Sequence, residues 1–344
     1  MTTPLDQPLP VAPREPLDET GAPRLGAYAG SLERIDLTPL LGTGVRARWL
    51  AATRQKKWQY VLLTSPEVVV ALAMVDLTYA SNCFCFVVDR ARREVLFEKS
   101  FLGLPGISAS IGAQPGLGAQ SSFQAGGAEL HFERVSDKYL GTARIGSALS
   151  LNFTLETASV APAVTMVVPT RGGILNVSQK WSGLPASGAL SLGERHFDLD
   201  GGFGGLDYTS GLLGRETVWR WAFGSGLDAR GRRVGFNLGE GVNSALPGEN
   251  ALWSGEAPAY LPEVRFTFES AAPLTPWRIR SDDGSVDLTF TGAGAHRESR
   301  NLLVAKSRFV QVAGEFNGKL RGPGGRAIEV VGLPGVVEDQ FVRW

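Results

Sequence analysis

Residues that could carry acid–base chemistry gather in one part of the second half of the chain. Asp207 and Tyr208 follow Gly204 and Gly205, and two adjacent glycines permit unusual backbone geometry or the close approach of another segment. An aspartic acid inside a water-poor barrel would have a raised pKa and could act as a proton donor. Arg215 offers the alternative, because a nearby arginine would hold Asp207 ionised as a structural ion pair. The residues alone leave both interpretations open.

Two tryptophans follow in a segment that predicts a strand. Trp219 and Trp221 would project to one face of it together with Thr217, while Arg220 would project to the other face. Directed into a barrel, the two indoles would form an aromatic wall for a flat or extended apolar ligand. The alternative is that both indoles fill a hydrophobic core.

Polar residues beyond this strand extend the cluster. Glu249 and Asn250 come at the end of a glycine-rich loop, 239–248, and loops on rigid barrels often carry binding residues. The alternative interpretation is that this pair simply belongs to a solvent-exposed turn. Glu338 and Asp339, near the end of the chain, are lesser candidates. We therefore take as candidate catalytic residues Asp207, Tyr208 and Glu249, and as candidate ligand-binding residues Arg215, Trp219, Trp221, Asn237, Asn250 and Tyr79.

The sequence lacks the motifs of several other kinds of functional site. The three histidines are scattered without ligand spacing, so no metal site is predicted. The segment 322–325 lacks the Lys-Ser/Thr of a phosphate-binding loop, and the sequence 108–110 lacks the elbow of serine hydrolases. Cys83 and Cys85 would lie about 7 Å apart on one strand face, which suits two buried thiols better than a disulfide. No cofactor is expected.

The chain is balanced in charge, with 34 basic and 34 acidic residues. A neutral protein offers no electrostatic basis for nucleic acid or an anionic membrane as its main partner. The first 25 residues lack a basic segment followed by an apolar core, which predicts no signal peptide. The longest apolar run, 68–75, is too short to cross a bilayer, so we expect a cytoplasmic protein without a transmembrane segment. The oligomeric state is left open.

The elements that must position these residues are short strands. The 43 glycines and 20 prolines are spread through an apolar chain, which indicates many strands joined by tight turns. No amphipathic helix longer than about two turns is predicted, and the stretch 103–118 is expected to be a long loop. Segments rich in β-branched and aromatic residues predict strands at 58–63, 68–75, 83–88, 94–101, 128–135, 140–145, 149–157, 163–169, 174–181, 217–223, 233–238, 263–269, 286–291, 302–304, 309–316 and 328–331.

This pattern favours an all-β fold of two antiparallel β-barrels packed together over any fold of alternating strands and helices. An aromatic–x–aromatic segment opens each half, which is consistent with duplication. The predicted domains are an extended N-terminal arm at 1–25, rich in proline and charge, a first barrel at 26–183 and a second barrel at 184–344.

Several short motifs are spread over the chain, namely Lys57-Trp58-x-Tyr60, 73–76 with Tyr79, Gly205-Leu-Asp-Tyr208 with Arg215, Trp219-x-Trp221, 231–232, 235–238, Glu249-Asn250 and 332–344. On these motifs the chain resembles the bacterial family of unknown function DUF2804 over nearly its whole length beyond the arm. More remotely, that family is similar to lipocalin-like two-barrel proteins that include carotenoid hydratases and pericyclase-type cyclases. The resemblance implies paired barrels and an apolar pocket, and it assigns no catalytic acid to a particular residue.

Three functions fit these observations, and whether the protein is an enzyme is left open. The first is acid-catalysed hydration, isomerisation or cyclisation of a hydrophobic lipid, polyene or isoprenoid-like molecule. In it Asp207 or Glu249 would donate the proton, Tyr208 would orient the donor, and the faces of the two indoles would stabilise developing positive charge.

The second function is a lipocalin-like protein that binds the same kind of small hydrophobic molecule without acting on it. The third is a carbohydrate-binding module, in which exposed Trp253 and Trp277 would stack on sugar rings.

Overall fold

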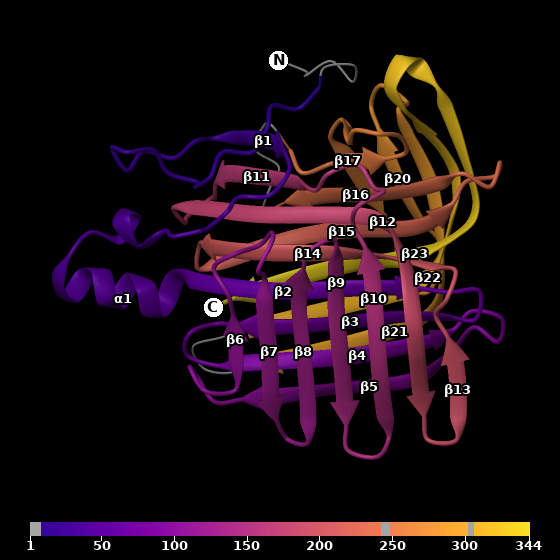
Figure 1. The fold of residues 1–344 in the computed structure, drawn as a ribbon, viewed down its shortest axis with the longest axis horizontal. Helices are drawn as coiled ribbons and strands as arrows, with labels where there is room; N and C mark the ends of the chain where they lie inside the picture. Colours follow the sequence, from indigo (N-terminus) through magenta and orange to yellow (C-terminus); the bar gives the residue numbers. More distant parts are fainter. Residues whose placement is uncertain (1–7, 242–247, 302–305) are drawn as a thin grey trace.

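Two antiparallel β-sheets, packed against each other, make up most of the molecule (Figure 1). This computed structural model describes residues 8–241, 248–301 and 306–344. Within those residues the sheets form a nearly closed barrel and a half-barrel, which confirms the predicted all-β class with two paired barrels. The strand predicted at 302–304 and most of the loop predicted at 239–248 lie outside the described residues.

The first sheet follows the order β5-β4-β3-β2-β14-β12-β10-β9-β8-β7-β6, with β1, β11 and β13 paired beside this path. Its strands are β1 (Gly26–Ala29), β2 (Gln55–Thr64), β3 (Val68–Asp76), β4 (Ser81–Asp89), β5 (Glu94–Gly103), β6 (Ala109–Ile111), β7 (Gln120–Ala125), β8 (Ala128–Val135), β9 (Lys138–Ile145), β10 (Leu149–Glu156), β11 (Val164–Pro169), β12 (Leu175–Leu192), β13 (Arg195–Asp198) and β14 (Gly202–Leu212).

The second sheet follows the order β18-β17-β16-β15-β23-β22-β21-β20-β19. Its strands are β15 (Glu216–Leu227), β16 (Arg233–Gly241), β17 (Ala251–Trp253), β18 (Ala259–Tyr260), β19 (Val264–Thr267), β20 (Trp277–Ser281), β21 (Val286–Asn301), β22 (Lys306–Arg321) and β23 (Ala327–Arg343).

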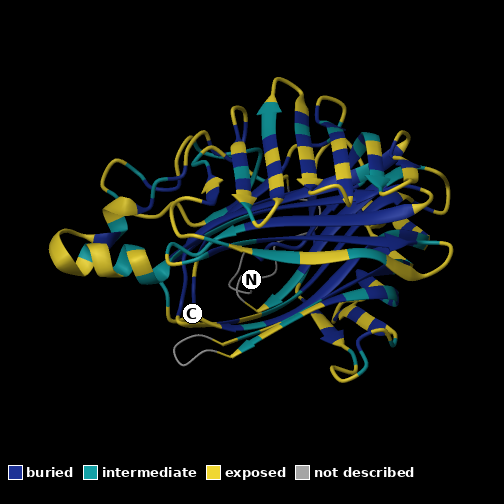
Figure 2. Cartoon of the chain, turned by 90° about the horizontal axis from the view of Figure 1, so that it is seen from below, coloured by how far each residue is buried: buried dark blue, intermediate teal, exposed yellow. Residues whose placement is uncertain are grey.

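Strands in the outer layer of the first sheet alternate between buried and exposed residues. In β10, Leu149, Leu151 and Phe153 are buried, while Ser150 and Asn152 are exposed, as the period-two pattern of the sequence predicts. Figure 2 shows this banding on strands along one side of the molecule, and uniformly buried strands through its middle. The banded strands therefore have one face on the core and one face in water.

Strands that lie between the two layers are buried on both faces. β3 is buried from Val68 to Met74, which explains its unbroken apolar sequence, since a strand covered on both sides needs no polar alternation. Cys83 and Cys85 lie in the adjacent strand β4 as buried free thiols. Their predicted role as buried side chains without a disulfide is confirmed.

Each sheet has its own hydrophobic core, and a third cluster of buried side chains joins the two sheets. The core of the second sheet includes Trp277, Phe290 and Phe316, all fully buried. The joining cluster includes Tyr60 from the first sheet and Trp221 from the second. Trp221, for which the sequence left open a barrel wall or a hydrophobic core, is buried in this joining cluster. It projects into the interface between the sheets.

The glycines of β14 allow this interface to close. A Cβ atom at Gly205 would lie 2.4 Å from the ring of Phe223, and a Cβ atom at Gly204 would lie 2.6 Å from the Leu155 side chain. Of the two roles predicted for this glycine pair, close approach is therefore the one that the structure shows. The glycine content also explains why the sequence did not predict β14 as a strand.

Helices contribute little to the fold. They are the 3₁₀ helices η1 (Thr38–Leu41) and η2 (Pro323–Gly325) and the 11-residue helix α1 (Gly44–Arg54). α1 exceeds the two-turn limit predicted from the sequence, and it escaped prediction because none of its residues is buried, so it has no clear apolar stripe. The loop predicted at 103–118 contains the short strand β6. Among the described residues, no helix has the length and apolar character needed to cross a membrane.

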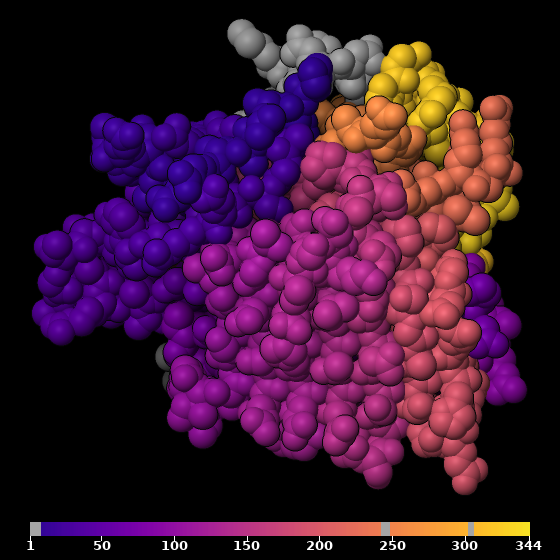
Figure 3. All heavy atoms as spheres, in the orientation of Figure 1, coloured from indigo at the N-terminus to yellow at the C-terminus, as the bar shows by residue number. Residues whose placement is uncertain are grey.

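The chain passes from the first sheet to the second between β14 and β15. The domain boundary predicted after residue 183 lies inside β12, because Gly183, with φ of +77°, forms a bulge through which the strand continues. The described part of the N-terminal arm makes single bridges between Val11 and Ala29 and between Leu17 and Pro23. In Figure 3 the arm and α1 form one flank of the molecule. The division into domains stays a prediction.

Candidate functional site

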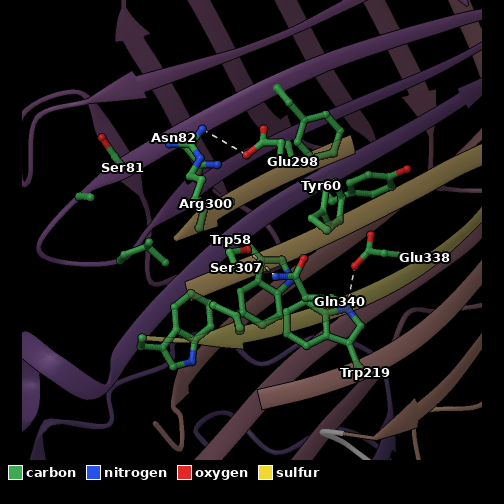
Figure 4. A pocket seen from close by; sticks show the side chains of 18 of the residues that line it. Trp58, Tyr60, Ser81, Asn82, Trp219, Glu298, Arg300, Ser307, Glu338 and Gln340 are labelled. Carbon is green, nitrogen blue, oxygen red and sulfur yellow. Dashed lines mark hydrogen bonds and ion pairs between the residues drawn. The ribbon is translucent and has the colours of Figure 1, made fainter. Parts of the chain in front are cut away.

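A cavity of about 330 Å³ lies between the two sheets. The first sheet contributes side chains from β2, β3 and β4, and the second sheet contributes side chains from β15, β21, β22 and β23. Figure 4 shows Trp58 and Tyr60 facing Trp219 and Glu338 across this space. The cavity therefore depends on how the sheets pack and belongs to neither sheet alone.

The first sheet presents a row of polar side chains to the cavity. Lys180 of β12 is paired in register with Asp207 of β14, and Asp207 is paired with Tyr60 of β2. Paired residues of antiparallel strands project to the same face of a sheet. Three residues that are far apart in the sequence therefore stand side by side, and all three line the cavity.

The second sheet presents a matching row. Trp221 of β15 is paired with Glu338 of β23, and Glu338 is paired with Gln311 of β22. The two rows meet where the Tyr60 hydroxyl donates a hydrogen bond to Gln311 Oε1 at 3.4 Å. The polar groups of both sheets therefore lie next to one another at the buried end of the cavity.

Lys180 is the cation of the first row. Its Nζ lies 2.7 Å from Asp207 Oδ2 and 3.5 Å from Glu249 Oε2, and all three side chains are less than a tenth exposed. Burial acts to lower the pKa of Lys180, but the two carboxylates outweigh it and raise that pKa above its ordinary value. Asp207 therefore has a buried countercharge, as one of the two interpretations of the sequence required, and Lys180 supplies it.

Glu338 is the buried acid of the second row. Trp219 Nε1 donates a hydrogen bond to its Oε1 at 2.6 Å, and Gln311 Nε2 donates one to its Oε2 at 2.9 Å. Burial raises the pKa of Glu338 to about 7, and the nearby Asp207 carboxylate adds to the rise against the effect of the two hydrogen bonds. Near neutral pH this carboxyl group can therefore both hold and release a proton.

The Gln311 amide can serve both protonation states of Glu338. Its NH₂ group donates to the ionised carboxylate, and after rotation of the amide its oxygen would accept from the protonated carboxyl. The Tyr60 hydroxyl on the far side of the amide both donates and accepts. Glu338 can therefore lose or take up a proton without leaving a buried polar group unpaired.

Aromatic faces surround the acid. Trp58 and Trp219 stack across the two sheets with ring centroids 5.9 Å apart and planes inclined by 13°. Tyr60 meets Trp221 edge-on at 5.1 Å. Such π faces attract positive charge and stabilise it best where water is scarce. Trp58 and Tyr60 of the first sheet thus stand with Trp219 and Trp221 of the second sheet around the cavity, and their role as a wall for a ligand stays a prediction.

Two of the predicted polar residues, Asn237 and Asn250, form hydrogen bonds around the aromatic side chains. Asn237 Oδ1 accepts a hydrogen bond from Trp221 Nε1 at 2.7 Å, and Asn237 Nδ2 donates to the Glu249 backbone oxygen at 2.9 Å. Asn250 Oδ1 accepts from the Gly239 backbone at 2.7 Å. Asn237 therefore orients one indole, and both amides tie the segment that carries Glu249 to β16.

Other predicted residues lie away from the buried end of the cavity. Tyr208 projects to the opposite face of β14 and donates a hydrogen bond to the Gly112 backbone oxygen at 2.8 Å. Tyr79 lines the rim of the cavity, and Arg215 lines a second hollow on the other side of Trp219. Trp253 and Trp277, predicted as exposed sugar-stacking residues of a carbohydrate-binding module, are fully buried, and their indole nitrogens donate to backbone oxygens of Pro162 and Pro273.

Glu338 also makes stability depend on pH. The pKa of Glu338 is about 7 in the folded protein, above the ordinary 4.5. The folded state therefore favours the protonated carboxyl group. The contribution of this preference to stability is complete below pH 4.5 and is lost as pH rises to 7 and above. The loss amounts to about 3 kcal/mol for a shift of this size. Glu338→Gln should therefore be more stable, relative to the parent, at pH 8 than at pH 4.5, as measured by urea unfolding. An equal difference at both pH values would contradict this expectation.

Comparison with known proteins agrees with this architecture. A family model described as a domain of unknown function (DUF2804) matches residues 11–344. No curated protein matches the chain significantly. Among solved structures, kievitone hydratase from Nectria haematococca aligns with a TM-score of 0.50 at 12% identity over 84% of this chain and 89% of that one. CghA aligns with a TM-score of 0.48 at 11% identity over 83% and 87%. At such identities the likeness to the hydratase concerns the fold.

Proposed function

Starting from the fact that the chain belongs to the DUF2804 family, we propose that it binds a small hydrophobic molecule between its sheets and transfers a proton to it from Glu338. The observation that carries this proposal is a carboxyl group with a pKa near 7, buried at the end of an aromatic cavity. A general acid works best when its pKa lies close to the pH at which it operates.

The proposed reaction begins with an alkene-like carbon of the bound molecule. The π electrons of the double bond take the proton of Glu338, which forms a new C–H bond and leaves a carbocation beside an ionised Glu338. Addition of water gives an alcohol after loss of a proton, and loss of a neighbouring proton gives a shifted double bond. Attack by a second double bond closes a ring and moves the positive charge to another carbon, which then loses a proton or adds water. Each route ends with return of one proton to Glu338.

The charges around the cavity suit such a cation. Lys180 faces two carboxylates, Asp207 and Glu249, so this group carries one more negative than positive charge when both acids are ionised. The ring faces of Trp58 and Trp219 add attraction without acting as nucleophiles. In this proposal Asp207 and Glu249 provide fixed charge, and the role of acid first considered for them passes to Glu338.

The nature of the ligand follows from the cavity walls. Between the buried polar end and the rim lie mainly apolar and aromatic side chains, among them Val75, Phe84 and Phe309. Such walls bind apolar surface and offer few partners to a polar molecule. The proposed chemistry extends to this chain the reaction class of the hydratase whose fold it shares.

Native mass spectrometry of the purified protein tests the binding half of the proposal. We expect a bound hydrophobic molecule that leaves on denaturation. Ala73→Phe, which places a ring at the cavity wall, should abolish its retention, whereas Gly255→Ala, at a position with no atom within 4 Å of an added Cβ, should keep it. Equal retention by both variants would place the molecule elsewhere, and a parent protein without bound molecule that binds no polyene would refute the proposal.

A further inference from the structure

The rim of the cavity carries cations, in contrast to its buried end. Arg300 of β21, Lys306 of β22 and Arg343 of β23 all line the opening, where Tyr79 and Leu102 are also exposed. Lys306 and Arg343 are exposed, and Arg300 is about a third exposed. Apart from Glu298, which contacts Arg300, the charged residues that line the open end are cations.

Two of these cations are neighbours in register. Lys306 is the direct cross-strand partner of Arg343, and like charges directly opposite each other destabilise a sheet. Arg343 has only an exposed contact of 3.6 Å with Glu216, and Lys306 has no ion pair within residues 8–241, 248–301 and 306–344. The structure thus keeps an unfavourable pair of cations at the rim.

Arg300 is the third cation, and the carboxylate that it contacts is shared with other groups. Glu298 Oε2 lies 3.1 Å from Arg300, but the same carboxylate also contacts His296 Nε2 at 3.4 Å and accepts a hydrogen bond from Ser100. Figure 4 shows the Arg300 side chain next to Asn82 on the cavity side. A guanidinium has five N–H donors, so donors remain for a ligand at the opening.

The spacing between the two ends sets the length of the ligand. Arg300 is paired with Ser307, and Ser307 with Val342, in a rim row that lies four residues along the strands from the row of Gln311 and Glu338. Four residues of a strand span about 13 Å. A molecule that reaches from Arg300 to the row of Glu338 must have an apolar body of about this length, and Lys306 and Arg343 lie one residue further out.

The two ends of the cavity also determine the orientation of the ligand. At the buried end, Asp207 and Glu249 stand against the single cation Lys180, so an anionic group there would meet repulsion in a water-poor setting. At the rim, three cations would attract the same group while it keeps contact with water. The anionic end therefore faces outward and the hydrocarbon end faces Glu338.

We propose that the ligand is an amphipathic anion, a carboxylate or phosphate on an unsaturated hydrocarbon body, held at its head by Arg300, with Lys306 and Arg343 adding positive charge at the opening. The inference rests on the proposed function for the position of the reacting carbon, but its headgroup claim concerns binding alone. Retinoic acid, retinyl phosphate and retinol share one polyene body and differ in headgroup, so they serve as probes.

Quenching of tryptophan fluorescence measures the affinity of each probe at low salt. The two anions should bind at least about tenfold more tightly than retinol, and the advantage should shrink on raising the salt concentration. Which anion binds more tightly identifies the headgroup class. Arg300→Gln and Lys306→Gln should each reduce the advantage by about threefold or more without changing retinol affinity. Lys319→Gln, on the same strand β22 but far from the cavity, should leave all three affinities unchanged.

The outcomes separate this inference from the proposed function. Equal affinity for the acid and the alcohol would overturn the headgroup claim and leave binding between the sheets intact. No affinity for any of the three polyenes would count against both. Lys306→Gln breaks no ion pair of the described residues, so it remains a fair test if Arg300→Gln proves unstable.

Discussion

Replacing Glu338 by Gln is expected to lower turnover of the bound molecule by roughly 10²–10⁴-fold and to change its affinity by less than about threefold. Gln has nearly the shape of Glu and can keep a hydrogen bond with Trp219 or Gln311, but it has no acidic proton to transfer. Turnover by the parent protein should also decline as pH rises through about 7, because the acid must be protonated to act. Single-turnover rates and equilibrium binding of the molecule that co-purifies measure both effects.

Asp339→Asn is the matched control for this experiment. Asp339 follows Glu338 on β23 but faces away from the cavity, where it lies 3.1 Å from Arg308 and 3.6 Å from Arg220. Its replacement should leave the rate per folded molecule and the pH profile unchanged. Unchanged turnover in Glu338→Gln would refute Glu338 as the acid, and binding without turnover in the parent protein would favour the non-catalytic alternative.

Lys180→Met is expected to reduce the free energy of unfolding by about 3–5 kcal/mol. The substitution leaves Asp207 and Glu249 buried without their shared cation, and burying an unpaired carboxylate costs far more than the ion pair itself contributes. Lys180 belongs to the first sheet, whereas Glu249 lies just before β17 of the second sheet. The loss should therefore weaken the packing of one sheet on the other. Urea unfolding of the purified variant measures it.

Adding Asp207→Asn to Lys180→Met should recover part of the lost stability, because it removes one of the two unpaired charges. Lys319→Met, an exposed substitution on the outside of β22, should change stability by less than about 0.5 kcal/mol. A Lys180→Met protein as stable as the parent would show that the three charged groups are not buried together.

Much of the fold could be predicted because its strands follow simple patterns. β8 has the bounds predicted, and β10 differs by one residue, since both alternate between core and water. β3 was recognisable from its apolar run. β14 could not be recognised, because its glycines serve contacts with Phe223 and Leu155, which are distant in the sequence. The bulge at Gly183 likewise looked like the end of a strand.

The site was only partly predictable for a related reason. Asp207, Glu249, Trp219 and Trp221 stand out by type and spacing, and the structure places all four at the cavity. Lys180 does not stand out, since a single lysine in a strand usually faces water. Its partners become visible only once β12, β14 and β17 are placed. Glu338 left a weak signal, a run of polar residues inside an otherwise apolar strand.

The position of β23 has a consequence for how the protein is made. This strand is last in the described chain, yet it lies between β15 and β22 in the second sheet. Until it is synthesised, both neighbours expose unpaired backbone edges, which invite association with other nascent chains. Glu338 lies on β23, so the acid joins the cavity only when this strand is inserted. Completion of the second sheet and completion of the cavity therefore depend on the insertion of the same strand.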